Sequence, residues 1–223
     1  MADTNTRDKL LFSHWHKRFE ALQTSLKRNN FKVFLAQDIE EVKKVFFKEI
    51  IPEVRPNSIS WGGSMTFVST GLYHELKDNI EYTILDTFDK KLSPEEMVER
   101  RRQALLVDLF ITSTNAITEK GQLVNLDMIG NRIGGLTFGP KHVVVLVGRN
   151  KIVKDLHTAM ERIRHYASPL NIKRLEKKSP CSKTSFCEDC SSVDRICNTW
   201  AITEKCFPAN RIKVILINSD LGL

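Results

Sequence analysis

All five cysteines of the chain lie in one short segment near its C-terminal end. Their spacing is C-x5-C-x2-C-x6-C-x8-C, at Cys181, Cys187, Cys190, Cys197 and Cys206. Thiolates gathered in a short irregular segment are the ligands that zinc or an iron–sulfur cluster requires, and metal ligation orders a segment with little apolar area to bury. The spacing predicts that the first four hold a cluster or zinc and that Cys206 stands apart. Two alternatives stay open, a redox or regulatory thiol set and unligated thiols.

A second group of reactive side chains lies where a predicted strand passes through two glycines into a predicted helix. Glycines let the backbone approach a ligand closely, and the free N–H groups of a helix start favour an anion. The pattern predicts a phosphate or carboxylate site formed by Gly62, Gly63, Ser64 and Thr66. The alternative is a tight turn in which Ser64 only caps the helix.

Residues 115–140 combine five glycines with polar side chains, which is typical of loops that present polar groups over a sheet edge. We expect four of these side chains to join the anion site: Asn115, Asp127, Asn131 and Arg132. Glu119 has the chemistry of a general base or a nucleophile. A solvated glutamate in a hairpin is the alternative for that residue.

Alternating strands and helices are predicted to position these residues. Helices are expected at 7–29, from 39 to a stop at Pro52, at 65–76 and 94–107, and after 147 with Ile152, Leu156, Ala159 and Ile163 on one face. Strands are expected at 31–36, 57–61, 81–86, 109–114, 122–126 as the hairpin partner of 109–114, 142–147 and 211–218. The alternation predicts one domain, residues 1–223, with a mostly parallel sheet. Residues 173–210 form an irregular, cysteine-rich excursion within it.

The composition fits a soluble globular protein, with 41% hydrophobic and 27% charged residues. No segment has the roughly 20 apolar residues of a membrane span, so we expect no membrane contact and a cytoplasmic location. Residues 141–183 contain eleven Lys or Arg against three Asp or Glu, an excess larger than the net charge of +7. This basic region suits anionic metabolites of the phosphate, carboxylate or CoA type, or is a solvated face. Nucleic acid is disfavoured because no binding motif accompanies the charge.

Several stretches together resemble the LUD (lactate utilisation) domain family in their order and spacing, over about residues 10–220. They are Gly62-Gly63-Ser64, the run from Asn115 to Val124, Gly139-Pro140 before the strand at 142–147, and Lys151-Ile152-Val153. Several family members have Thr-Gly-Thr where this chain has Lys120-Gly121-Gln122. The cysteine segment resembles that of the stand-alone branch, and the shorter lactate-operon members lack it.

The resemblance implies a Rossmann-like α/β fold, similar to ribose-5-phosphate isomerase, glucosamine-6-phosphate deaminase and the CoA-transferases. The sheet would be mostly parallel with flanking helices, an inserted hairpin and a cysteine-rich loop. The implied function is that of an accessory or electron-transfer component in the oxidation of lactate to pyruvate, beside iron–sulfur partner proteins. The alternative is a sugar-phosphate isomerase or acyl-CoA transferase using Glu119, because class I CoA-transferases use a glutamate near a glycine at a comparable place.

A third possibility is a nucleic-acid-binding or regulatory protein whose thiols sense redox state. The amphipathic N-terminal helix also leads us to expect a homodimer, the commonest oligomer of soluble proteins.

Overall fold

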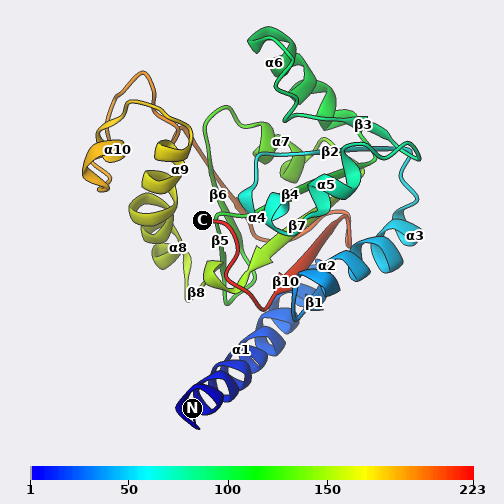
Figure 1. Ribbon diagram of the computed structural model, residues 1–223, viewed down its shortest axis with the longest axis vertical. Coiled ribbons are helices and arrows are strands. Elements are labelled where there is room, and N and C mark those ends of the chain that lie inside the picture. Colours follow the sequence, from blue (N-terminus) through cyan, green and yellow to red (C-terminus); the bar gives the residue numbers. More distant parts are fainter. Residues whose placement is uncertain (1) are drawn as a thin grey trace.

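The computed structural model describes residues 2–223, and its centre is an open sheet in which all neighbouring strands run parallel (Figure 1). The strands are, in spatial order, β1 (Lys32–Ala36), β10 (Ile212–Ile217), β7 (His142–Gly148), β4 (Leu109–Ser113), β2 (Ser58–Trp61) and β3 (Thr83–Leu85). The last strand of the chain pairs with the first, so the cysteine-rich excursion lies within the fold. The predicted α/β class with a mostly parallel sheet is confirmed.

Both faces of this sheet are buried, and alternate residues of β7 point into two separate cores. Val143 and Val145 pack in the first core, whereas Val144 and Leu146 pack in the second. The elements contributing to the first core include α1 (Ala2–Arg28), η2 (Ala104–Leu106), which follows α6 (Pro94–Gln103), and α7 (Asn131–Thr137). Those contributing to the second include α2 (Ile39–Val45), η1 (Phe46–Ile50), α3 (Ile51–Val54), α4 (Met65–Ser69) and α5 (Leu72–Leu76).

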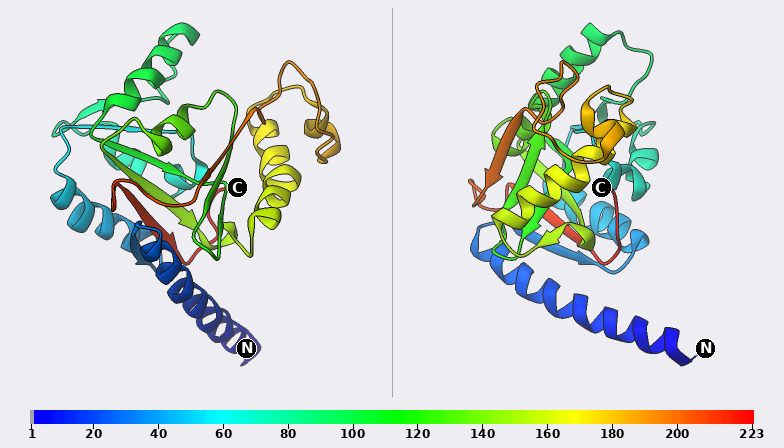
Figure 2. Two further views of the ribbon diagram at one scale, coloured as in Figure 1. Left: turned by 180° about the vertical axis from the view of Figure 1, so that it is seen from behind. Right: turned by 90° about the vertical axis from the view of Figure 1, so that its left-hand side faces the viewer.

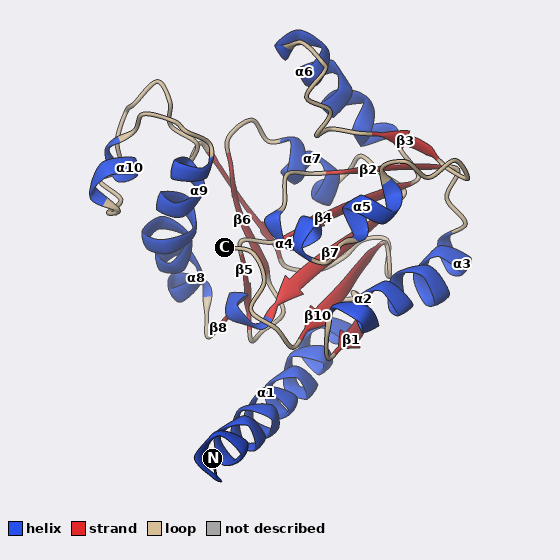
Figure 3. Ribbon diagram, viewed as in Figure 1, coloured by secondary structure: helices blue, strands red, loops and turns tan. Residues whose placement is uncertain are grey.

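A small second sheet extends from one side of the molecule. Its strands, in order, are β8 (Ile152–Val153), β5 (Ala116–Thr118), β6 (Leu123–Asp127) and β9 (Thr199–Thr203). Ile117 and Leu123 face the first core, and Ala116 and Val124 face a third core under the C-terminal helices. Those helices are α8 (Leu156–Arg162), η4 (Ile163–Ala167) and α9 (Ser168–Arg174), followed by the short α10 (Pro180–Thr184) (Figures 2 and 3). The 3-10 turn η3 (Arg149–Lys151) links β7 to β8.

Two predicted helix starts are present with their capping hydrogen bonds. The Asp38 carboxylate accepts from the backbone N–H of Glu41 at 2.8 Å. Ser93 and Glu96 form a complete capping box, in which each side chain accepts from the other residue's backbone. These local patterns therefore place α2 and α6 correctly.

Two predicted helix boundaries are wrong. The helix from residue 39 does not stop at Pro52 but continues to Val54, because a π-helical turn precedes the proline and so accommodates its missing N–H. It ends where Arg55 adopts a left-handed conformation with φ of 47°. The expected helix at 65–76 is divided into α4 and α5 at Gly71, whose φ is 76°.

Three predictions about the position or pairing of strands are also wrong. The hairpin partner of β6 is β5, because the chain leaves the main sheet after β4 and starts a new one. Ile152, expected on a helix, lies in β8, which pairs with β5. The excursion at 173–210 contains a regular strand, β9, which pairs with β6 through backbone hydrogen bonds that a polar sequence does not reveal.

Helix α1 extends beyond the body of the molecule (Figure 2). Its outer part carries exposed Leu10, Leu11 and Phe12. Homodimer formation through this helix stays a prediction. Within residues 2–223, no helix is long and apolar enough to cross a bilayer.

Candidate functional site

A pocket of about 230 Å³ opens at the edge of the main sheet where the parallel strands end. In open α/β sheets this edge is where ligands bind, because the loops after neighbouring strands meet there. The segments that follow the strands of the main sheet contribute Gly63, Ser64 and Met65 after β2, Thr87 and Phe88 after β3, Ser113, Thr114 and Asn115 at the end of β4, and Lys151 after β7. The segment from the end of β6 into α7 contributes Leu126, Asp127, Met128, Ile129, Asn131 and Arg132. The other lining residues are Arg101, Ala167, Ser168, Asn171, Arg174, Leu175, Ile196 and Leu223.

Lys151 lies on this pocket and is only 4% exposed. Its ammonium group donates to Thr66 Oγ1 at 2.8 Å, to Ser113 Oγ at 2.9 Å and to the Thr114 carbonyl at 3.2 Å. All three acceptors are uncharged, and within residues 2–223 Lys151 makes no salt bridge. A buried cation without a counter-ion is costly, so the arrangement is suited to an anionic ligand.

The surroundings hold the pKa of Lys151 well below its usual value. Loss of hydration is the main cause, and the nearby positive charges of Arg162 and Arg132 lower the pKa further. A bound anion would reverse part of this effect, since an opposite charge favours the protonated amine.

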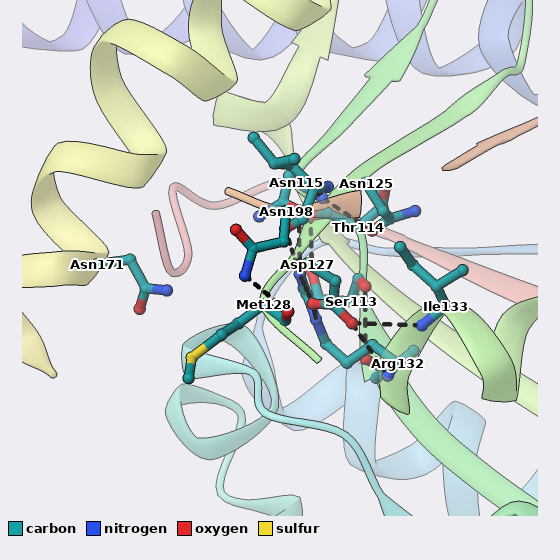
Figure 4. Close-up of polar contacts among 12 residues, drawn as sticks. Ser113, Thr114, Asn115, Asn125, Asp127, Met128, Arg132, Ile133, Asn171 and Asn198 are labelled. Carbon is teal, nitrogen blue, oxygen red and sulfur yellow. Dashed lines mark hydrogen bonds and ion pairs between the residues drawn. The ribbon is translucent and has the colours of Figure 1, made fainter. Parts of the chain in front are cut away.

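Arg132, at the start of α7, is fixed by a dense set of hydrogen bonds (Figure 4). Its Nε donates to Asp127 Oδ1 at 2.7 Å, and its Nη2 donates to Asn115 Oδ1 and to the Leu126 carbonyl, both at 3.1 Å. The two charged side chains are 12% and 8% exposed. A Cβ on Gly62 would lie 2.7 Å from Arg132 Cγ, so the glycine makes room for the arginine stem.

The pocket as a whole is positively charged. Four cationic side chains line it, Lys151, Arg132, Arg101 and Arg174, and Asp127 is the only acidic side chain among the described lining residues. Because Asp127 is already paired with Arg132, the other cations have no acidic partner in the pocket wall. Arg162, behind the pocket, donates to the carbonyls of Asn150 and Asn115 at 3.0 and 2.8 Å.

The last described residues of the chain pass over the innermost part of this pocket. Thr66 Oγ1 donates to the carbonyl of Leu221 at 3.2 Å, and Leu223 lines the pocket. A Cβ on Gly222 would lie 2.4 Å from Thr66 Oγ1 and 3.4 Å from Lys151 Nζ. The backbone there touches the hydroxyl that Lys151 contacts, and a side chain would not fit.

Most of the ligand-binding residues expected from the sequence gather in one place. Those that line the pocket are Gly63, Ser64, Asn115, Asp127, Asn131 and Arg132. Thr66 contacts Lys151 beside it, and Gly62 lies behind Arg132. Ser64 also caps α4, since its hydroxyl accepts from the Phe67 N–H at 3.0 Å, so the capping alternative describes its local role.

Glu119 lies elsewhere. It follows β5, four residues along the chain from Asn115, a separation on the order of 13 Å in an extended strand. Its half-exposed carboxylate accepts from Arg18 of α1 at 2.8 Å, and it does not line the pocket. A role for Glu119 as base or nucleophile stays a prediction.

The role of Lys151 was not predicted from the sequence, because the helix expected after residue 147 included this position. The available signal was a lysine three residues after the strongly apolar strand β7, at the edge where other polar residues were already expected.

The four cysteines expected to bind metal surround a second, smaller cavity. Cys181, Cys187, Cys190 and Cys197 all line it, together with Arg164 and Arg195, Glu188 and Asp189, and apolar residues of the third core. Burial raises the pKa of the Cys197 thiol, and the nearby thiols of Cys187 and Cys181 add to this effect; a hydrogen bond with Ser168 and the charge of Arg195 oppose it. Among the described residues, no three His, Cys, Asp or Glu side chains are grouped to hold a single metal ion.

Arg195 organises the loop that carries these thiols. Its guanidinium donates to the backbone carbonyl of Cys190, to that of Cys197 at 2.9 Å and to Asp189 Oδ1 at 2.8 Å. Cys206 lies apart in the first core, where its sulfur accepts from the Ile212 N–H at 3.2 Å.

The two cavities share a wall made of Leu126, Ser168 and Ile196, each of which lines both. Hydrogen bonds to the backbone also connect the cysteine loop to the wall of the anion pocket. Asn198, the residue after Cys197, donates its N–H to the carbonyl of Asp127 at 3.0 Å and its side-chain amide to that of Met128 at 3.1 Å (Figure 4).

Comparison with known proteins gives a family match. Residues 19–217 match the profile described as the LUD domain. No curated protein matches the chain. A similar solved structure is that of a DUF162 family protein from Deinococcus radiodurans, with 10% sequence identity and a TM-score of 0.43, covering 91% of this chain and 98% of that one.

Proposed function

The chain belongs to the LUD domain family and is thus related to lactate utilisation, and on this premise we propose that its strand-end pocket binds a small anionic metabolite. The ligand would be a carboxylate of the size of lactate or pyruvate. The protein would act as an accessory or electron-transfer component in the oxidation of lactate to pyruvate.

The observation that carries the proposal is the buried ammonium group of Lys151. It is held by neutral oxygens in a pocket whose only acidic side chain among the described residues is already paired. A carboxylate next to Lys151 Nζ would supply the missing negative charge, and the hydroxyl of Ser64, which accepts from the Phe67 N–H, can donate a hydrogen bond to one of its oxygens.

The size of the pocket favours a small ligand. Sites for drug-sized molecules and cofactors enclose about 300–1,000 Å³, whereas this pocket encloses about 230 Å³. A three-carbon acid fits that space better than CoA does. Inorganic phosphate shares the anion chemistry, so the experiment must separate the two.

Titration calorimetry with L-lactate, pyruvate, inorganic phosphate and CoA tests the proposal. We expect one of the two carboxylates to bind more tightly than phosphate, and Lys151→Met to weaken that binding at least tenfold. Met is matched to Lys in length and shape but has no charge. Arg28→Met, at the end of α1, is the control for loss of a distant positive charge. Tighter binding of phosphate or CoA, or equal binding by wild type and Lys151→Met, would overturn the proposal.

A further inference from the structure

The cysteine cavity carries a second inference, which in its last step rests on the proposed function. We propose that Cys181, Cys187, Cys190 and Cys197 hold an iron–sulfur cluster in this cavity, and that occupancy of the neighbouring anion pocket shifts the reduction potential of the cluster.

The arrangement of the thiols favours a cluster over a single ion. Four thiolates bound to one zinc ion lie about 2.3 Å from a common point and leave no space between them. Here the four cysteines instead line the wall of a shared cavity. Four cysteines around a common space are the usual ligand set of a cluster of several irons and sulfides.

Two arginines orient the wall of the cavity. Arg195 and Arg164 both line it, together with Glu188 and Asp189. Arg195 also contacts the backbone on both sides of the loop through the carbonyls of Cys190 and Cys197, so it holds two of the four ligands on the cavity wall. Its remaining nitrogen donates to Asp189, and Arg164 lies over the ring of Trp200, with its Cζ 5.8 Å from the ring centroid.

The shared wall makes the two sites electrostatically dependent on each other. Leu126, Ser168 and Ile196 are the only described residues that line both cavities, and two of these side chains are apolar. Charges on the two sides of a water-poor wall are weakly screened. Reduction adds one electron and no atom to the cluster, so an anion in the neighbouring pocket disfavours it.

Thermodynamic linkage relates the shift in reduction potential to the difference in anion affinity between the oxidised and reduced forms. If the anion binds the oxidised form tenfold more tightly than the reduced form, the midpoint potential falls by about 59 mV, the one-electron equivalent of a factor of ten. The electron would be exchanged with an external one-electron carrier, such as an iron–sulfur protein.

Anaerobic purification followed by iron and sulfide analysis tests the cluster. We expect about two or four irons per chain, with as much sulfide, and visible absorption that is bleached by dithionite. Cys187→Ser should lose most of the iron. Cys206→Ser is the matched control, because Cys206 is away from the cavity and a hydroxyl can keep its contacts. One zinc per chain, no metal, or equal iron loss in both variants would overturn the proposal.

Redox titration with and without L-lactate or pyruvate, whichever binds in calorimetry, tests the coupling. We expect the midpoint potential to fall when the anion is present and to stay unchanged in Lys151→Met. An unchanged potential with the anion bound would overturn the coupling and leave the anion pocket standing. If no anion binds in calorimetry, the proposed function and the coupling both fail, while the iron analysis still decides the cluster.

Discussion

The two cavities of this protein share a wall and are built in different ways. The anion pocket is formed by the ends of β2, β4 and β7, which are buried in two cores, and its charged residues are held by hydrogen bonds to strands. The cysteine cavity is formed by a loop whose main organiser is Arg195. Rigid strand ends can hold a charged side chain in an unfavourable place without its ligand, whereas a loop needs its ligand to become ordered.

If the cysteine loop depends on its ligand, metal removal should have the largest effect on local stability. Chelating the iron from the purified protein should leave the backbone amides of residues 176–198 nearly unprotected from hydrogen exchange, because few of them are in regular structure. The amides of β4 and β7 should keep their protection. Exchange measured by mass spectrometry shows this directly, and equal protection of the loop before and after chelation would mean that it does not depend on metal.

The next largest effect is expected within the anion pocket. Arg132→Ala removes the guanidinium that neutralises the buried Asp127 carboxylate and leaves it only the backbone N–H groups of residues 132 and 133, so the free energy of unfolding should fall by about 3 kcal/mol. Denaturant titration measures this change. Arg174→Ala, on the same pocket, is the control; Arg174 donates to Asn171 Oδ1, an uncharged acceptor, so its loss should lower the stability by less than about 1 kcal/mol. A similar small loss of stability in both variants would show that the buried Arg132–Asp127 ion pair contributes little to stability.

Lys151→Met should stabilise the protein although it weakens anion binding. Removing a buried cation without a counter-ion should raise the free energy of unfolding by about 1–3 kcal/mol at neutral pH. The pKa of Lys151 is lower in the folded than in the unfolded chain, so between the two values the unfolded chain binds more protons and stability rises with pH. Denaturant titrations at several pH values should show this rise in wild type and its loss in the variant. A less stable variant would indicate that Lys151 is structural.

The smallest effect is expected for Glu119→Gln. The ion pair with Arg18 is partly exposed, so its loss should change stability by less than about 1 kcal/mol. Anion affinity should be unchanged, because Glu119 does not line the pocket. Loss of anion binding, or of acyl labelling by an acyl-CoA, in this variant would favour the transferase alternative instead.

Patterns that depend on neighbouring residues were predicted well from the sequence. The helix starts after Asp38 and Ser93 and the apolar strands β7 and β10 are present as expected, although only Ser93 forms a complete capping box. The polar residues expected at the sheet edge also gather there, because parallel strands bring their carboxyl ends to one side. Local sequence was sufficient for these features.

Features that depend on distant pairing were not predictable in the same way. β9 is a strand because β6 provides its hydrogen-bond partners, and the pairing of β5 with β6 is set by the departure of the chain from the main sheet. The importance of Lys151 comes from Thr66 and Ser113, which are 85 and 38 residues away in the chain. Only the folded structure shows that its ammonium group is buried among neutral oxygens.

If Lys151 is a buried amine whose charged form is stabilised by a bound anion, proton uptake on binding shows this most directly. Calorimetric titration of the bound carboxylate in buffers of different ionisation enthalpy measures the protons taken up on binding. Above the lowered pKa of the free amine, we predict that each anion bound takes up close to one proton, and that affinity falls up to tenfold per pH unit as the pH rises. Lys151→Met should take up none. Proton uptake near zero in wild type, with an affinity independent of pH, would contradict the account.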